Sequence, residues 1–293
     1  MDNLLTVLNI TAPVFLLATI GYVWVRLGFE YRVEFVTRLA MTLSLPCLIF
    51  TSLMKSDVAP GALATLSLAS LTAYGMVTVA CFLLVKALQL DVRTFLAPLI
   101  FGNTGNLGMP LALFAFGEIG LDYAVVVFAV MAMISFTFGI WLVSGGGSLK
   151  KLVQEPLVAA TVLGAIFLWQ GWQTPLVLTN TLELIGQIVI PIMLITLGVA
   201  VARLETKAMG QAVALSVVKA GICAGCAWWV ATWFRLEPVA AAVLIVQVST
   251  PIAVTSYMLA EKYGADAQPV AGLVVASTLL SVITLPLILA FVI

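Results

Sequence analysis

Hydrophobic residues along this chain form runs of about 20 residues, separated by short polar connections such as Phe29-Glu30-Tyr31-Arg32. A helix that crosses the hydrocarbon core of a bilayer needs about 20 apolar residues. The pattern therefore predicts an all-helical integral membrane protein with about ten spans. The predicted spans cover residues 4–25, 35–54, 62–87, 95–117, 121–143, 156–172, 176–200, 209–234, 239–260 and 268–292.

A glycine-rich stretch at residues 144–148 falls between the fifth and sixth predicted spans and has the composition of a linker. It divides the chain into residues 1–147 and residues 148–293. Each half holds an odd number of spans, so the halves are predicted to lie in the membrane with opposite orientations. Leu45-Pro46 in the first half matches Ile190-Pro191 in the second. We therefore expect two inverted repeats that form one membrane domain.

Two predicted spans are interrupted by residues that disfavour a continuous helix. Residues 102–110 read Gly-Asn-Thr-Gly-Asn-Leu-Gly-Met-Pro, and residues 246–251 read Val-Gln-Val-Ser-Thr-Pro. Glycine lowers the cost of irregular backbone, and proline removes a hydrogen-bond donor. Interrupted spans at corresponding positions of two halves are typical of the binding site of a secondary transporter. The predicted substrate-binding residues in these breaks are Asn103, Thr104, Asn106, Pro110, Gln247, Ser249, Thr250 and Pro251.

The charge at the ends of broken helices indicates the kind of ligand. The N-terminus of a half-helix carries partial positive charge, and this suits a carboxylate. The alternative is that glycine, serine and proline serve only close packing between membrane helices. Two breaks in corresponding positions, one of them with two asparagines, favour a binding site over packing alone.

Lys219 is a ninth candidate site residue, because it lies near the middle of the predicted span at 209–234. A lysine at the centre of a membrane helix costs on the order of 3 kcal/mol on insertion scales and is a functional candidate. It could counter a substrate carboxylate, titrate during proton coupling, or bind the C-terminal end of a half-helix. The alternative is that its aliphatic stem lets the ammonium group reach the membrane surface.

The composition supports membrane insertion and excludes several classes of function. Hydrophobic residues make up 63% of the chain and charged residues 9%, whereas soluble domains carry about 25% charged residues. The net charge is zero and there is no histidine, so the sequence gives no reason to expect a nucleic-acid partner. The four cysteines lie in apolar spans, and we expect neither disulfides, a metal site nor a cofactor.

Basic residues are unevenly divided between the two sides of the predicted membrane domain. Since cytoplasmic loops are enriched in lysine and arginine, the richer side is predicted to be cytoplasmic, with both termini outside. Only Lys55 and Arg235 fall on the outer side. The residues on the richer side are Arg26, Arg32, Arg38, Lys86, Arg93, Lys150, Lys151, Arg203, Lys207 and Lys262.

Residues 101–110, Phe-Gly-Asn-Thr-Gly-Asn-Leu-Gly-Met-Pro, resemble the fourth-helix motif of the auxin efflux carrier family. This family belongs to the bile acid/sodium symporter superfamily, and the chain resembles a compact bacterial member, in the inner membrane. The resemblance covers the whole chain and implies a scaffold subdomain and a transport subdomain with crossed fourth and ninth helices. It also implies transport of small organic anions, and a homodimer is expected on this resemblance alone.

The chain departs from the plant members of that family in two places. It reads Thr250-Pro251-Ile252 where plant carriers have Asn-Pro-Asn, and its predicted third span, residues 62–87, lacks their acidic residue. These differences argue against copying auxin specificity or proton coupling from the plant carriers. Either a proton or a sodium ion could be the coupling ion.

The sequence thus predicts a secondary carrier of small carboxylates that works by alternating access in a lipid bilayer. A membrane-embedded sensor or partner subunit that binds the anion without transporting it is the alternative, and a channel is a third option. An enzyme is not expected, because the sequence offers no nucleophile paired with a base, no metal cluster and no Walker loop.

Overall fold

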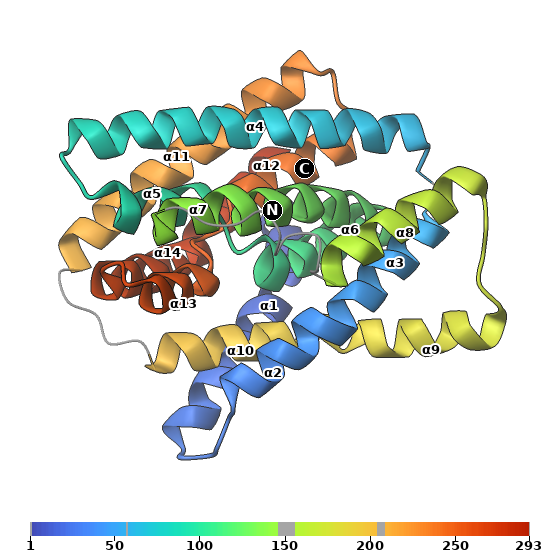
Figure 1. Ribbon diagram of the computed structural model, residues 1–293, viewed down its shortest axis with the longest axis horizontal. Coiled ribbons are helices and arrows are strands. Elements are labelled where there is room, and N and C mark those ends of the chain that lie inside the picture. Colours follow the sequence, from blue (N-terminus) through green and yellow to red (C-terminus); the bar gives the residue numbers. More distant parts are fainter. Residues whose placement is uncertain (1, 57, 146–155, 204–208, 293) are drawn as a thin grey trace.

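The computed structural model describes residues 2–56, 58–145, 156–203 and 209–292, and every secondary-structure element in these residues is a helix. The described residues also contain one isolated antiparallel β-bridge, between Gly102 and Ile252. In Figure 1, α4 runs across the upper part of the molecule with α6 below it, α11 crosses α4 obliquely, and α9 and α10 lie below α6. The all-helical prediction is confirmed for the described residues.

Uninterrupted helices form where the apolar runs contain no cluster of glycine, asparagine and proline. α4 begins at a proline, which fits the first turn of a helix because that turn lacks acceptors for its N–H groups. The continuous helices are α1 (Asp2–Arg26), α4 (Pro60–Ala87), α8 (Pro156–Gln170), α11 (Met209–Trp233) and α14 (Ala267–Val292).

Two further stretches change helix type or direction close to a proline. α2 (Val33–Leu39) continues through the π-helical turn η1 (Ala40–Ser44) into α3 (Leu45–Lys55), which contains Pro46. α9 (Leu176–Gln187) ends just before α10 (Val189–Arg203), which contains Pro191. The matched Leu45-Pro46 and Ile190-Pro191 pairs thus lie at comparable irregularities of the two stretches.

The breaks predicted at residues 102–110 and 246–251 are present. α5 (Val92–Ile100) stops before the first break, and the chain resumes as the π-helical turn η2 (Thr104–Gly108) and α6 (Met109–Ile134). α12 (Pro238–Val248) stops at the second break and α13 (Val254–Tyr263) follows it. α6 turns sharply at Gly117 and leads through η3 (Ser135–Gly139) to α7 (Ile140–Ser144).

Six helical stretches within the described residues are long and apolar enough to cross a membrane, and three shorter helices are also apolar. The chain is therefore an integral membrane protein. The predicted count of ten spans stays a prediction, because α5, α12 and α13 are individually short on either side of the breaks. The long stretches are residues 33–55, 60–87, 104–144, 176–203, 209–233 and 267–292.

The helices pack in two groups. α1 packs on α10, and α3 packs on both α8 and α9; we call α1, α2, α3, α8, α9 and α10 the flanking group. α4 packs on α5, α6 and α11, and α11 packs on α12 and α14; these helices, with α7, α13 and η2, form the crossing group. Gly198 lets α10 approach α1 closely, because a Cβ there would overlap the carbonyl of Ala18.

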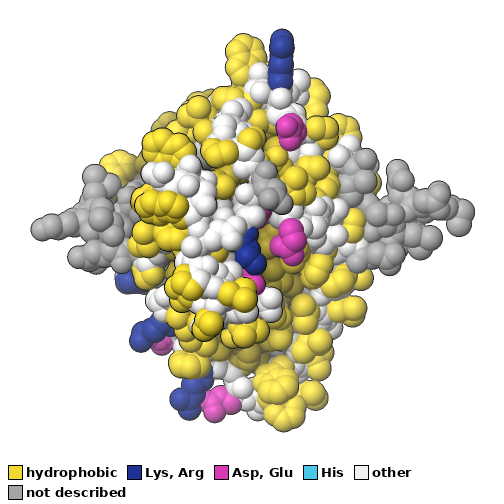
Figure 2. All heavy atoms as spheres, turned by 90° about the vertical axis from the view of Figure 1, so that its right-hand side faces the viewer, with side chains coloured by type: hydrophobic (Ala, Val, Ile, Leu, Met, Phe, Trp, Pro, Cys, Tyr) yellow, Lys and Arg dark blue, Asp and Glu magenta, His cyan; other side chains and the backbone are white. Residues whose placement is uncertain are grey.

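Hydrophobic side chains cover much of the outside as well as the interior. One side of α4 exposes Leu68, Val79 and Leu83, whereas its other side buries Leu66, Tyr74 and Val77. Figure 2 shows one face of the molecule, where charged side chains are few among hydrophobic ones. Such a surface is unfavourable in water and suits the acyl chains of lipid.

Candidate binding site at the crossing of two broken helices

The two breaks cross and pair through their backbones. Gly102 and Ile252 form the antiparallel bridge, and the N–H of Asn103 donates to the carbonyl of Pro251 at 2.6 Å. The N–H of Ala253 donates to the carbonyl of Phe101 at 3.4 Å. Each break thus satisfies polar groups of the other, which is how non-helical backbone becomes tolerable inside a membrane protein.

Two glycines allow this close approach. A Cβ on Gly102 would overlap Oγ1 of Thr250 and would lie 3.0 Å from the Thr250 carbonyl oxygen. A Cβ on Gly108 would overlap Oε1 of Gln247 and lie 3.2 Å from Cγ2 of Thr250. A residue with a side chain at either position would push the two breaks apart.

Four predicted site residues carry buried polar atoms with no hydrogen-bond partner among the described residues. They are Nδ2 of Asn103, Oγ1 of Thr104, Oε1 of Gln247 and Oγ of Ser249. Their residues are at most 4% exposed. An unpaired buried polar group costs about 1–3 kcal/mol, so a cluster of them at one crossing indicates a site that a polar ligand or water completes.

The ends of four half-helices meet at this crossing. η2 begins at Thr104 and α13 begins at Val254, so both positive N-terminal ends lie next to the bridge. α5 ends at Ile100 and α12 ends at Val248, which brings the two negative C-terminal ends to the same place. An anion is favoured beside the first pair of ends and a cation beside the second.

Lys219 lies on the negative side of the crossing. Its side chain is buried at 2% exposure, and Nζ donates to the carbonyl of Thr250 at 2.8 Å and approaches Sγ of Cys223 at 3.8 Å. Oγ1 of Thr250 in turn donates to the carbonyl of Gln247 at 2.7 Å. Of the three roles considered from the sequence, this geometry matches binding to the end of a half-helix, here α12.

Further residues at the crossing were not predicted from the sequence. Oγ of Ser277 on α14 accepts from the N–H of Ile252 at 3.0 Å, and the buried hydroxyl of the neighbouring Thr278 has no hydrogen-bond partner in the described part of the chain. The amide of Gln247 donates to the carbonyl of Ala124 at 3.5 Å. Serines and threonines are frequent in the apolar runs, so neither Ser277 nor Thr278 carried a signal of its own.

Asn106 and Pro110 occupy the edges of the site. Pro110 is buried in the first turn of α6, where its missing N–H leaves no helical bond unmade. Asn106 is half-buried and lines a small cavity of about 30 Å³ between η2, α2, α10 and α13, which we call the narrow hollow. The predicted residues that meet at the crossing itself are therefore Asn103, Thr104, Gln247 and Thr250. Asn106 lies at its edge, in the wall of the narrow hollow.

A much larger cleft lies along α6. It has a volume of about 680 Å³ and is lined by α3, α6, α9 and α10, including Leu113 and Pro191. We call it the wide cleft. Lys55 and Glu183 form an ion pair in its wall, and Oγ of Ser52 on α3 donates to Asp122 on α6. Leu113 is one helical turn beyond Pro110, so the wide cleft ends close to the crossing.

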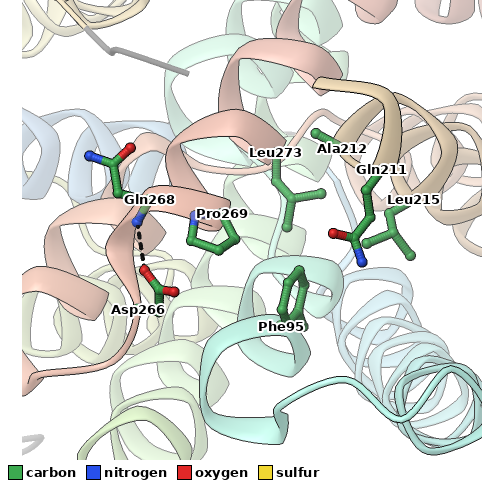
Figure 3. Close-up of a pocket in the computed structure, with 8 residues that line it drawn as sticks. All are labelled: Phe95, Gln211, Ala212, Leu215, Asp266, Gln268, Pro269 and Leu273. Carbon is green, nitrogen blue, oxygen red and sulfur yellow. Dashed lines mark hydrogen bonds between the residues drawn. The ribbon is translucent and has the colours of Figure 1, made fainter. Parts of the chain in front are cut away.

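A third cavity lies away from the crossing. It has a volume of about 150 Å³ between α5, α11 and α14, and Figure 3 shows Phe95, Leu215 and Leu273 pointing into it. Its one charged lining residue, Asp266, accepts a hydrogen bond from the N–H of Gln268 at 3.2 Å. It contains none of the predicted site residues, and we do not assign it to the site.

Comparison with known proteins identifies the family. A profile of the family described as "Membrane transport protein" matches residues 6–148 and 141–289. The chain belongs to this membrane transport protein family. The match confirms the resemblance to the auxin efflux carriers that was inferred from residues 101–110.

Two archaeal relatives of this chain are also described as transporters. An uncharacterized transporter of Methanothermobacter thermautotrophicus is 26% identical over 289 residues, which cover 94% of each chain. An uncharacterized transporter of Methanocaldococcus jannaschii is 25% identical over 199 residues, or 64% of each chain. These names give no substrate, so the chemistry of the ligand has to be argued from the site.

Proposed function

We propose that this transporter is a secondary carrier of small carboxylates and that the carboxylate binds at the crossing of the two breaks. The observation that carries the proposal is the meeting of two half-helix N-termini, at Thr104 and Val254, beside the amide nitrogen of Asn103, which has no hydrogen-bond partner among the described residues. Backbone N–H groups and an amide donor match a carboxylate, which only accepts hydrogen bonds. Asn103, Thr104 and Ser249 would donate to it.

Lys219 acts in this proposal as a positioning residue and does not contact the substrate. Its ammonium group is already bound to the Thr250 carbonyl at the end of α12. A cation at this position offsets the partial negative charge of the C-terminal ends of α5 and α12. The net potential at the crossing then stays favourable for an anion.

The proposed architecture is ten spans in two inverted repeats, residues 1–147 and 148–293. The correspondence of the two breaks supports it, as do the two irregular stretches near Pro46 and Pro191. The two ranges matched by the family profile meet at residues 141–148, close to the proposed boundary. We further propose a cytoplasmic membrane location with both termini outside, on the distribution of basic residues.

We propose that transport proceeds by alternating access, and the position of the crossing between two hollows of unequal size supports this. The wide cleft of about 680 Å³ reaches to within a turn of Pro110, whereas the narrow hollow of about 30 Å³ on the far side of Asn106 is nearly closed. Both hollows lie between the flanking group and the crossing group. A movement of one group against the other would open one hollow as it closes the other.

The test is transport and binding by the same purified protein. Saturable uptake of a labelled carboxylate into proteoliposomes is expected in the wild type and is expected to be lost in Asn103→Ala, with the variant still correctly inserted. Imposed proton and sodium gradients would identify the coupling ion. Binding with a normal affinity but without flux would replace the carrier by the sensor alternative, and flux without saturation would indicate a channel.

A further inference from the structure

A further cleft lies at the edge of the flanking group, where the connection between α1 and α2 meets the last turn of α10. It has a volume of about 570 Å³, and the connection between α1 and α2 is at the lower left of Figure 1. We call it the arginine cleft. It shares Val33 with the narrow hollow but contains none of the predicted substrate-binding residues. Its charged lining residues are Glu30, Arg32, Glu34, Arg38 and Arg203.

Hydrogen bonds to α10 hold the connection between α1 and α2 in place. The hydroxyl of Tyr31 forms a hydrogen bond with Oγ1 of Thr196 at 2.7 Å, and Nη2 of Arg203 donates to the carbonyl of Tyr31 at 2.7 Å. Arg203 has no carboxylate partner among the described residues. A guanidinium group has five N–H donors, so Arg203 is fixed at the cleft with most of its donors available to a ligand.

The other two arginines of the cleft form ion pairs that a ligand can displace. Arg32 pairs with Glu30 at 2.6 Å and Arg38 with Glu34 at 3.1 Å, and these four side chains are 72–84% exposed. Exposed ion pairs contribute little to stability. A phosphate group accepts two parallel hydrogen bonds from a guanidinium and is the stronger partner. Because three guanidinium groups face two carboxylates, the cleft also keeps an excess of positive charge.

Aromatic and aliphatic side chains place the arginine cleft at the boundary between lipid headgroups and acyl chains. The rings of Trp24 and Phe29 lie 4.8 Å apart and are exposed, and Nε1 of Trp24 donates to the carbonyl of Glu30 at 3.3 Å. Tryptophan is enriched at the level of the headgroups. Phe35, in the cleft itself, and Leu43, in η1, are also exposed and offer apolar surface to acyl chains. A soluble phosphate would leave this apolar surface unused.

We propose that the arginine cleft binds the phosphate group of an anionic phospholipid through its three arginines, and that an acyl chain of the same lipid lies along Phe35. Basic residues at the membrane surface attract anionic lipids. A zwitterionic lipid such as phosphatidylcholine has the same phosphate but adds a quaternary ammonium group, which the excess of positive charge disfavours. The bound lipid bridges α2 and α10. This inference does not depend on the proposed substrate.

The experiment measures the binding of phosphatidylglycerol and of phosphatidylcholine with identical acyl chains to the purified protein in detergent, by native mass spectrometry. The wild type is expected to bind phosphatidylglycerol about tenfold more tightly than phosphatidylcholine. The double variant Arg32→Gln/Arg38→Gln is expected to lose this preference. Both side chains are exposed, so the variant is expected to fold and to remain monodisperse. Arg203→Gln, which leaves both ion pairs in place, is expected to weaken the preference by itself.

The matched control is Arg235→Gln/Lys262→Gln, which removes two exposed positive charges from the crossing group. It is expected to keep the preference for phosphatidylglycerol. Equal binding of the two lipids by the wild type, or an unchanged preference in Arg32→Gln/Arg38→Gln, would overturn the inference. Inorganic phosphate is added as a competitor. Displacement of phosphatidylglycerol by phosphate at a concentration similar to that of the lipid would make the cleft a site for soluble phosphate and would also overturn the assignment to a lipid.

Discussion

Single residues at the crossing are constrained by distances that leave no room for substitution. Gly102 is the clearest case, because Thr250 occupies the space that a side chain would need. Asn103 differs, since its side-chain amide is buried and has no partner among the described residues. The first residue is required for the approach of the two breaks, and the second is available for a ligand.

Gly102→Ala is expected to abolish carboxylate binding, because the added methyl group separates the two breaks. The matched control is Gly221→Ala on α11, where a Cβ meets nothing within 4 Å. That change is expected to preserve binding and to stabilise the helix by up to about 1 kcal/mol. Binding isotherms and thermal unfolding of both proteins in detergent give the comparison. Normal binding by Gly102→Ala would show that the close approach of the breaks is dispensable.

Lys219→Met is expected to reduce transport at least tenfold while the protein remains folded. The substitution leaves the Thr250 carbonyl without its buried donor, at a cost of about 1–3 kcal/mol, but also removes a buried charge, so the change in stability is small. Lys262→Met, at the exposed end of α13, is the control. Uptake rates and monodispersity in detergent are measured. Transport at the wild-type rate in Lys219→Met would refute its positioning role.

The residues of the site divide into those that the sequence reveals and those that it does not. Asn103 and Thr250 stood out because glycine, asparagine and proline interrupt long apolar runs, and Lys219 because a mid-span charge is costly. Ser277 and Thr278 did not, since a serine or threonine in a continuous helix has no local signature. Their relation to the crossing arises from the packing of α14, which no local pattern predicts.

At the scale of elements, the half-helix α5 is stabilised by an N-cap of its own. α5 begins after Asp91, whose carboxylate accepts from the N–H of Thr94 at 2.9 Å and from its hydroxyl at 2.6 Å. The hydroxyl bond is the main reason why the pKa of Asp91 is lowered, despite an opposing effect of partial burial. α5 leads directly to the first break, so its cap helps to fix where the break begins.

Asp91→Ala is expected to destabilise the protein by about 1 kcal/mol at neutral pH, as for other N-caps. The pKa of Asp91 is lower in the folded state, so this stabilisation is present above the unfolded value of about 3.9 and is lost as the pH falls through the folded value. Thermal unfolding of wild type and variant from pH 3 to 8 should show a difference in Tm that is constant above about pH 5 and shrinks below it. A difference that grew on acidification would contradict the assigned cap.

The sequence predicted where the helices are broken better than it predicted the local geometry of each helix. The positions of both breaks and of the turn near Gly117 follow from glycine and proline in the apolar runs. The π-helical turns η1, η2 and η3 were not predicted, because they result from the fit of one helix against its neighbours. The interruption between α9 and α10 lies close to Pro191, within residues 176–200, which the apolar pattern predicted as one span.

At the scale of the whole molecule, the crossing lies between a wide cleft and a nearly closed hollow. The structure therefore predicts that a probe reaches the crossing from one side only. Leu113 on α6 lines the wide cleft and Thr255 on α13 lines the narrow hollow, and both are half-buried. They form a matched pair of positions for chemical labelling.

Leu113→Cys is expected to react with a bulky maleimide at least severalfold faster than Thr255→Cys. Both substitutions are made in a Cys226→Ala background, because Cys226 is partly accessible while the other three cysteines are buried. Labelling rates in proteoliposomes and the side from which a membrane-impermeant maleimide reacts are measured. Equal rates at both positions would show that the crossing is open to both sides or to neither.

The most direct test of the central claim is counterflow, by Asn103→Asp, of the labelled carboxylate that the wild type transports. A carboxylate at position 103 would occupy the place of the substrate carboxylate and repel it, so counterflow should be lost. Asn180→Asp makes the same change on an exposed turn of α9 and should leave counterflow intact. Loss in the first variant alone would support carboxylate binding at the crossing, and normal counterflow in Asn103→Asp would contradict it.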